Sequence, residues 1–482
     1  MLQVPEIIKR TSFYIDGAWR EPAASEVIEV INPANERAYA VISAGTANDI
    51  DAAVSAARAA FDDWSARSKE ERLGFIRKIA DVYEACSDEM AQAISCEMGA
   101  PRKLSRESQA AVGLLHLRAF IKAVEDYSFE YMPSPERPEQ KVVHEPIGVC
   151  GLITPWNWPM NQIVLKVIPA IAVGCTVVLK PSEIAPMSAM LFADFVDRAG
   201  LPKGVFNLVN GEGAVVGEAL SRHPEVDMIS FTGSTRGGTA VSRAAAATVK
   251  RVSLELGGKS PNIVFADCDL ATTVAMGVAH CFENSGQSCN APTRMLVERS
   301  VYDQAVAYAA QAARATKVGD PAKEGDHIGP LVSKLQFDKV QALVDKAVAE
   351  GARLVAGGPG RPEGLSEGYF VRPTVFADVT NDMTVAREEV FGPVLAIIPF
   401  HTEEEAVRIA NDTPYGLSAY VQTRDEARAQ RVARKMRAGM VQINGTPRAP
   451  GTPFGGYKQS GNGREGGKWG LEDFLEVKLI SG

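Results

Sequence analysis

The sequence has few of the residues from which metal centres and disulfide frameworks are built. Its 482 residues include six histidines and seven cysteines, and no two cysteines form a CxxC pair. Because the cysteines are odd in number and widely scattered, they predict neither a disulfide framework nor a zinc site. No two histidines lie four residues apart, so we expect no bound metal.

The sequence also lacks basic runs and long apolar runs. The formal net charge is −8, and no block of lysine and arginine opposes it, so nucleic acid and acidic membrane surfaces are not expected as partners. The longest apolar run, residues 167–179, is interrupted by Pro169 and Gly174 and is shorter than the roughly 20 residues of a membrane span. Residues 1–10 lack the apolar segment of a secretory signal, so we expect a cytoplasmic protein without a membrane partner.

Helical patterns dominate the first part of the chain, which is too long overall for a single core. One pattern runs from Ile50 to Phe61 after Thr46 as a possible cap. A second runs over 69–98 and stops at Gly99. The following stretch, 132–141, is rich in proline and charge and predicts a connection or an exposed arm.

Short apolar runs separated by helix-compatible segments follow from residue 149. The predicted strands are 149–153, 176–179, 205–209, 227–231 and 251–256. Strands buried on both faces and separated by helices are typical of a parallel doubly wound α/β sheet, which binds ligands at the carboxyl ends of its strands.

A second α/β region is expected after Gly258. Its predicted helices are 270–283, 301–315, 336–350, 403–410 and 426–436. Its predicted strands are 295–297, 394–399 and 440–443, and the tail 472–480 is a further short strand.

Two glycine-rich turns follow predicted strands. At 211–217 a plain strand-to-helix turn is favoured over a phosphate contact by Gly213. At 231–234, Gly233 permits close backbone approach, and the helix that begins after Ser234 offers free N–H groups to a pyrophosphate. A capped helix start explains this second motif equally well.

Lys180 and Glu183 project from the carboxyl edge of the sheet, because Pro181 ends their strand. An ammonium and a carboxylate at this place suit the hydroxyls of an adenosine ribose. A solvated ion pair is the alternative.

The turn 154–159 contains two tryptophans, two prolines and Asn157. A stiff turn holds a side-chain amide in a fixed orientation, as an oxyanion-hole donor requires. Packing alone explains the tryptophans but not the asparagine.

Glu255 and Cys289 are the candidate base and nucleophile. Glu255 ends an otherwise apolar strand, where burial raises a carboxylate pKa toward the range of a general base; an ion-paired structural glutamate is the alternative. Cys289 lies in a loop of small residues, and a lone cysteine of this kind is more often inert.

Taken together, these segments resemble the aldehyde dehydrogenase superfamily. The matching segments are TPWNWP at 154–159, KPSE at 180–183, FTGS at 231–234, ELGGKSP at 255–261, GQSC at 286–289, EEVFGP at 388–393 and PFGGYKQSGNGRE at 453–465. They follow the order and spacing of that family over nearly the whole chain.

The resemblance implies oxidation of an aldehyde to the carboxylic acid. Cys289 resembles the nucleophile that forms a thiohemiacetal and then a thioester, with the Asn157 amide and the Cys289 backbone N–H as oxyanion donors. Glu255 resembles the base that activates water to hydrolyse the thioester. Lys166 and Glu465 match positions that relay the proton of this base. We expect the site either to lower the Cys289 pKa or to offer Glu255 as its proton acceptor.

The resemblance also implies NAD as the cofactor. Lys180 and Glu183 resemble the adenosine-ribose contacts, and Gly233 and Ser234 the pyrophosphate contacts. The Glu183 carboxylate would repel a 2′-phosphate, so NAD is expected in preference to NADP. The further expected contacts are Ile153, Thr154, Pro155, Trp156, Ser182, Gly213, Phe231, Leu256, Glu389 and Phe391.

The aldehyde tunnel is expected, by position in the family, to involve seven side chains. They are Trp158, Gln162, Leu165, Phe282, Glu283, Arg448 and Phe454. Glu283 would disfavour an anionic substrate, whereas Arg448 can pair with Glu283, hold a substrate carboxylate, or simply be solvated. The sequence leaves the choice of aldehyde open.

The family fold implies three parts. A Rossmann-type parallel-sheet cofactor domain is expected at 1–127 and 147–257, and a second α/β catalytic domain at 258–469. A small β oligomerisation arm at 128–146 and 470–482 predicts a homodimer or homotetramer.

Three rival functions remain to be tested. A coenzyme A-acylating dehydrogenase would cleave the thioester with a thiol, but Glu255 favours water. A non-enzymatic relative would have lost the thiol, the amide or the base, and all three are present. A cysteine hydrolase that uses His280 would not need the cofactor motifs found at the ends of the predicted strands.

Overall fold

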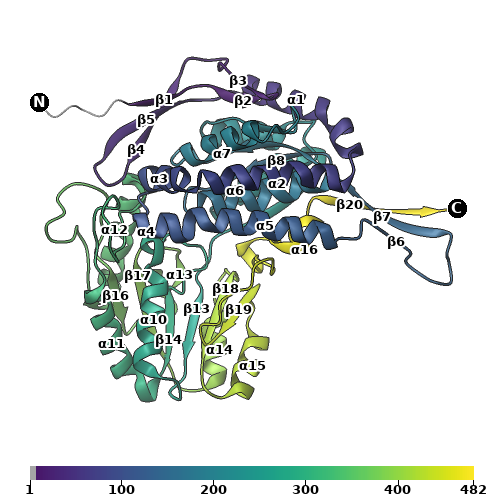
Figure 1. Ribbon diagram of the computed structural model, residues 1–482. Coiled ribbons are helices and arrows are strands. Elements are labelled where there is room, and N and C mark those ends of the chain that lie inside the picture. Colours follow the sequence, from purple (N-terminus) through teal and green to yellow (C-terminus); the bar gives the residue numbers. More distant parts are fainter. Residues whose placement is uncertain (1–6) are drawn as a thin grey trace, which may run out of the picture.

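The computed structural model describes residues 7–482, which form two seven-stranded sheets and two three-stranded sheets. Figure 1 shows the two large sheets one above the other, with a small β arm that projects from the body near the C-terminus. Residues 1–6, on which the expected absence of a secretory signal partly depends, lie outside the described part of the chain.

The first large sheet has a parallel centre and an antiparallel edge. Its strand order is β12-β11-β8-β9-β10-β2-β3, and all pairs from β12 to β10 are parallel. The strands are β2 (Phe13–Ile15), β3 (Ala18–Arg20), β8 (Val149–Ile153), β9 (Thr176–Lys180), β10 (Phe206–Leu208), β11 (Met228–Thr232) and β12 (Arg251–Glu255). The five parallel strands coincide with the predicted ones, while the β2–β3 edge was not predicted.

Helices cover this sheet. They are α1 (Ala47–Ala66), α2 (Lys69–Ala85), α3 (Ser87–Met98), α4 (Arg102–Leu104), α5 (Ala111–Asp126), α6 (Pro159–Val173), α7 (Met187–Arg198), α8 (Glu218–Arg222) and α9 (Thr235–Ala245). Thr46 caps α1 in a capping box with Asp49, as the sequence predicts for its start. The single helical pattern predicted over 69–98 is wrong, because Cys86 (φ −113°, ψ 20°) leaves the helical conformation and separates α2 from α3.

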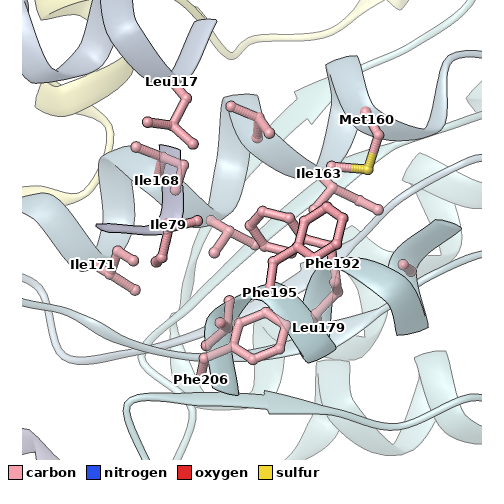
Figure 2. Packing of buried hydrophobic residues seen from close by; sticks show 14 of the residues in the cluster. Ile79, Leu117, Met160, Ile163, Ile168, Ile171, Leu179, Phe192, Phe195 and Phe206 are labelled. Atoms are coloured by element: carbon pink, nitrogen blue, oxygen red, sulfur yellow. The ribbon is translucent and has the colours of Figure 1, made fainter. Parts of the chain in front are cut away.

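The core of this part lies around α6, which is predominantly apolar and buried along its whole length except at Asn161. Pro159 begins the helix and Gly174, at φ 107°, ends it in the left-handed conformation. Figure 2 shows Ile163 of this helix beside Phe192 and Phe195 of α7, with Phe206 of β10 below them. This packing fixes the start of α6, and with it the turn 154–158, relative to the sheet.

The second large sheet is parallel except at one edge. Its order is β15-β16-β17-β14-β13-β18-β19, with only the β15–β16 pair antiparallel. The strands are β13 (Pro261–Val264), β14 (Arg294–Glu298), β15 (Arg353–Ala356), β16 (Thr374–Ala377), β17 (Val394–Phe400), β18 (Ser418–Gln422) and β19 (Met440–Ile443). The helices are α10 (Leu270–Phe282), α11 (Tyr302–Ala315), α12 (Lys334–Ala349), α13 (Thr384–Arg387), α14 (Glu403–Asn411), α15 (Glu426–Lys435) and α16 (Gly467–Glu472).

Two small three-stranded sheets complete the fold, the first mixed and the second antiparallel. Near the N-terminus, β5 (Arg37–Ser43) lies between β1 (Ile8–Arg10) and β4 (Val27–Asn32). The arm contains β6 (Glu130–Tyr131), β7 (Gln140–Pro146) and β20 (Leu475–Ser481).

The arm is fastened to the first sheet through β12. The Arg251 guanidinium donates to the backbone oxygens of Asp473 and Leu475 at 3.0 and 2.7 Å. The Ser253 hydroxyl donates to the Asp473 carboxylate at 2.6 Å. The connection therefore uses the same strand that carries Glu255 at its end. Within residues 7–482, no helix combines the length and apolar character needed to cross a membrane.

Candidate active site

Cys289 lies at the end of a tightly bent loop that follows α10. Asn284, Ser285 and Gly286 all have positive φ values, of 53°, 56° and 72°. A Cβ atom on Gly286 would come within 2.1 Å of the Gly392 backbone oxygen, so only glycine fits there. The bend turns the chain back from α10 and places the half-buried Cys289 in a cavity.

Burial raises the pKa of the Cys289 thiol above its ordinary value, and the nearby carboxylates of Glu389, Glu255 and Glu465 raise it further. The sequence left two routes to a reactive thiolate, a lowered pKa of Cys289 or transfer of its proton to Glu255. The first of these expectations is therefore wrong for the chain by itself. The remaining route is transfer of the thiol proton to a base.

Asn157 is held by a network of buried amides. Its Nδ2 donates to the Gln287 backbone oxygen at 3.0 Å, and its own backbone oxygen accepts from Asn284 Nδ2 at 2.9 Å. Gln109 Nε2 donates to Asn284 Oδ1 at 2.9 Å, and Gln287 Oε1 accepts from the Val332 N–H at 2.9 Å. Because a primary amide has two N–H bonds, the network leaves Asn157 with one that can point at an oxyanion.

Glu255 ends β12 and is 2% exposed. Neither of its carboxylate oxygens has a hydrogen-bond partner among residues 7–482, which excludes the ion-paired structural alternative for that part of the chain. Burial, and then the neighbouring Glu465, raise the pKa of Glu255 well above its ordinary value, although Lys166 and Arg464 oppose the shift. A carboxylate with these properties can accept a proton near neutral pH.

Lys166 and Glu465 form a buried ion pair beside this base. Lys166, from α6, places its Nζ 2.6 Å from Glu465 Oε1 and 3.1 Å from the Ser230 hydroxyl. The second oxygen of Glu465 has no partner among the described residues. The loop that carries Glu465 is fixed by two backbone hydrogen bonds with Phe454, at 2.8 and 2.7 Å.

The carboxyl edge of the first sheet carries the residues expected at the adenosine ribose. Lys180, at the end of β9, is 3% exposed, and its Nζ lies 2.8 Å from the Glu183 carboxylate. The Glu183 side chain is partly open to solvent, so this pair can exchange its mutual contact for ligand hydroxyls. Ile153, Thr154 and Ser182 lie at the same edge.

The N-terminus of α9 lies at the end of the next strand, β11. Ser234 caps the helix by accepting from the Gly237 N–H at 3.1 Å. A Cβ on Gly233 or Gly237 would come within 2.7 Å of the Phe231 ring, so the chain passes closely over Phe231. Gly213 instead begins an exposed turn after β10, where a Cβ would meet nothing within 4 Å.

Glu389 and Phe391 reach the junction of the two sheets. Glu389 Oε1 accepts from the Gly258 N–H at 2.9 Å, and Phe391 packs edge-on against Trp156 at 5.4 Å. Leu256 joins this junction by donating its N–H to the Ser460 oxygen at 2.9 Å.

These residues fit a dinucleotide. The sheet edge offers an ammonium and a carboxylate for ribose hydroxyls, free N–H groups at a helix start for a pyrophosphate, and a second carboxylate near Cys289 for the other ribose. In the part of the chain that the structure describes, no cluster of three or more histidine, cysteine and acidic side chains is arranged to hold a metal ion.

A cavity of about 310 Å³ reaches the thiol from the opposite side. It is lined by Cys289 and by six of the seven expected tunnel residues, namely Trp158, Gln162, Leu165, Glu283, Arg448 and Phe454. The seventh, Phe282, lines a neighbouring cavity of about 500 Å³. Sequence reasoning did not find the remaining lining residues, among them His116 and Asn161, because their motifs carry no distinctive spacing.

Comparison with known proteins agrees with this geometry. The family model described as "Aldehyde dehydrogenase family" matches residues 19–480. A curated relative from Pseudomonas sp., 3-succinoylsemialdehyde-pyridine dehydrogenase, is 54% identical over 471 residues and 98% of each chain.

Solved structures give the same result. The aldehyde dehydrogenase of Bartonella henselae has a TM-score of 0.98 and 54% identity, covering 98% of this chain and 100% of its own. A mutant of aldehyde dehydrogenase C from Pseudomonas syringae, in complex with NAD⁺ and octanal, has a TM-score of 0.96 and 51% identity, covering 98% and 96%. The chain belongs to the aldehyde dehydrogenase family.

Proposed function

We propose that this chain oxidises an aldehyde to the carboxylic acid with NAD, through a thioester on Cys289. The proposal rests mainly on one observation. The Cys289 thiol, the Asn157 amide and the Glu255 carboxylate, which has no hydrogen-bond partner among residues 7–482, lie together where the carboxyl edge of the first sheet meets a cavity. Structures of two relatives, from Pseudomonas syringae and Staphylococcus aureus, contain NAD⁺.

The first step is addition of the Cys289 sulfur to the aldehyde carbon. Because burial raises the pKa of this thiol, its proton must pass to an acceptor, and Glu255 is a nearby carboxylate without a hydrogen-bond partner among residues 7–482 whose own pKa burial raises well above its ordinary value. The carbonyl oxygen becomes an oxyanion, which the free N–H of Asn157 and the Cys289 backbone N–H stabilise.

Bound NAD supplies the acceptor for the hydride that leaves the former aldehyde carbon, and this oxidation leaves a thioester on Cys289. Lys180 and Glu183 would hold its adenosine ribose, the α9 N-terminus at Gly233 and Ser234 its pyrophosphate, and Glu389 its second ribose. Trp156 and Phe391 pack edge-on against each other beside this position.

Hydrolysis of the thioester completes the cycle. Before this step Glu255 passes the proton that it accepted from Cys289 to the Lys166–Glu465 pair, so that it is a carboxylate again. It then takes a proton from water as the water oxygen attacks the acyl carbon, and the carbon–sulfur bond breaks to release the acid and the thiolate. The proton on Glu255 leaves through the Lys166–Glu465 pair, whose free Glu465 oxygen is available as the next acceptor.

Product analysis tests this function. The purified chain, supplied with NAD and octanal, should form NADH and octanoic acid in equal amounts, and Cys289→Ser should form neither. Addition of coenzyme A should leave the product unchanged. Formation of octanoyl-coenzyme A would instead support the acylating alternative.

We also propose an arm-mediated homodimer or homotetramer. The proposed parts are a cofactor domain at 1–127 and 147–257, a catalytic domain at 258–469 and an arm at 128–146 and 470–482. Support comes from the outer strand of the arm, β20, where Val477 and Leu479 are 68% and 60% exposed. Light scattering should give a multiple of the 51.6 kDa chain mass, and Val477→Asp should lower it.

We place the enzyme in the cytoplasm, because Cys289 must stay a reduced thiol to act as the nucleophile. Cell fractionation with activity measurement tests this location.

A further inference from the structure

The cavity that contains Cys289 is lined by an arginine that forms no ion pair within residues 7–482. Arg448 lies in the loop that follows β19 and is half-buried. Its Nη1 contacts the Met440 sulfur at 3.3 Å, and its Nε is buried with no hydrogen-bond partner among residues 7–482. A thioether is a weak acceptor, so the guanidinium keeps most of its capacity to donate.

The position of this guanidinium is nevertheless well defined. Its central carbon lies 4.9 Å above the centre of the Phe454 ring, which is a favourable cation–π arrangement. Phe454 is in turn fixed by its two backbone hydrogen bonds with Glu465. A planar guanidinium held in one position in this way is preorganised to donate hydrogen bonds to a carbonyl or carboxylate oxygen.

Two other polar side chains of the cavity donate or accept within the protein, whereas Gln162 offers an amide oxygen that has no partner among residues 7–482 but carries no charge. The His116 ring pairs with Asn161 Oδ1 at 2.9 Å, and the Trp158 indole donates to the Ser288 hydroxyl at 2.8 Å. Arg448 is therefore the cationic donor that remains for a ligand in the cavity that contains Cys289.

Glu283 does not neutralise Arg448. The structure forms no ion pair between the two within residues 7–482, and Glu283 is exposed. Its side chain is shared with the outer cavity, where Lys103 and Lys317 also lie. Both side chains line the cavity that contains Cys289; Glu283 also lines the outer cavity, and Arg448 also lines two further cavities of about 540 and 590 Å³.

We propose that Arg448 recognises a second carbonyl oxygen on the substrate, so that the enzyme prefers oxo-aldehydes and semialdehydes to plain alkanals of the same length. The oxygen belongs to a carboxylate or a ketone, and both accept hydrogen bonds from a guanidinium in the same way. This inference rests on the proposed function and adds the class of aldehyde to it.

Matched substrate pairs test the inference. Butanal is compared with succinic semialdehyde for the carboxylate, and pentanal with 4-oxopentanal for the ketone, by kcat/KM for NADH formation. The wild type should favour the second member of each pair. Arg448→Met keeps the length of the stem but removes the donors, and should reduce this preference about 10- to 100-fold for the carboxylate and about 5-fold for the ketone. Butanal and pentanal themselves should change less than about twofold.

Two further variants separate recognition from structure. Arg424→Met removes an exposed arginine outside the tunnel and should leave both preferences unchanged. Arg448→Lys keeps the positive charge but loses the planar set of N–H donors. It should therefore retain part of the preference for succinic semialdehyde over butanal and little of the preference for 4-oxopentanal over pentanal.

An unchanged preference in Arg448→Met would overturn the inference while leaving the proposed function intact. An equal loss for all four aldehydes would also overturn it, because the arginine would then only support the loop. Absence of NADH from every aldehyde with the wild type would overturn the proposed function, and the inference with it.

Discussion

Replacement of Glu255 by glutamine should separate the two chemical halves of the reaction. The change is nearly isosteric, and neither oxygen of Glu255 has a hydrogen-bond partner in the part of the chain that the structure describes. Glutamine therefore breaks no bond of the fold, and the effect should be chemical. Hydride transfer precedes attack by water, so one NADH per chain should still form in a burst.

The magnitude follows from the role of a general base. Such a base contributes about 10²- to 10⁴-fold, so steady-state turnover should fall by this factor, or about 3–5.5 kcal/mol in the barrier. The burst itself should become slower, because the thiol must lose its proton without Glu255. Burial raises the pKa of Cys289, so the thiolate fraction, and with it the burst rate, should rise with pH across the neutral range.

Stopped-flow NADH absorbance measures both phases. Glu70→Gln, an exposed change on α2, is the matched control and should behave as the wild type. If the burst were missing at every pH, Glu255 would be indispensable for thiol addition. That result would refute the assignment of Glu255 mainly to the hydrolysis step. Turnover close to the wild-type value would refute its role as the base.

Three other substitutions have defined outcomes. Glu183→Gln removes the charge that repels a 2′-phosphate and should raise the ratio of kcat/KM with NADP to that with NAD about tenfold; equal ratios in both proteins would show that Glu183 does not choose the cofactor. Asn157→Ala should lower kcat about 10²- to 10³-fold with a nearly unchanged KM, and a thermal melt checks that loss of its bond to Gln287 has not loosened the loop. Lys166→Met leaves the Glu465 carboxylate buried without its cation and should cost about 3–5 kcal/mol in urea unfolding at neutral pH. Lys166→Met combined with Glu465→Leu should recover part of that deficit, because it leaves no unpaired buried charge; a double variant no more stable than Lys166→Met would contradict the ion-pair explanation.

The parallel centre of the first sheet was predictable because strands buried on both faces form uninterrupted apolar runs. The strands that were not predicted lack this signal: β4 and β5 are partly exposed, and β13 is short and begins with Pro261. The break at Cys86 was not visible because the apolar spacing continues across it from α2 into α3.

The positions of the reactive groups followed from motifs, whereas their surroundings did not. Gln109 contacts Asn284 across 175 positions of sequence, and no local pattern predicts such a pairing. The same holds for Arg448, since the absence of a partner is a property of three-dimensional packing. The raised pKa of Cys289 is likewise set by burial in the folded structure and then by carboxylates from distant segments.

Strand β12 gives the arm and the base a common mechanical support. Arg251, Ser253 and Glu255 alternate along it, so their side chains emerge on one face of the strand. Arg251 and Ser253 donate hydrogen bonds to the beginning of the arm, and Glu255 is the carboxylate that we propose as the base for hydrolysis. A displacement of the arm is therefore transmitted to the strand that ends at Glu255. In the arm-mediated assembly proposed above, separation of the chains should consequently slow hydrolysis of the acyl-enzyme before it affects hydride transfer.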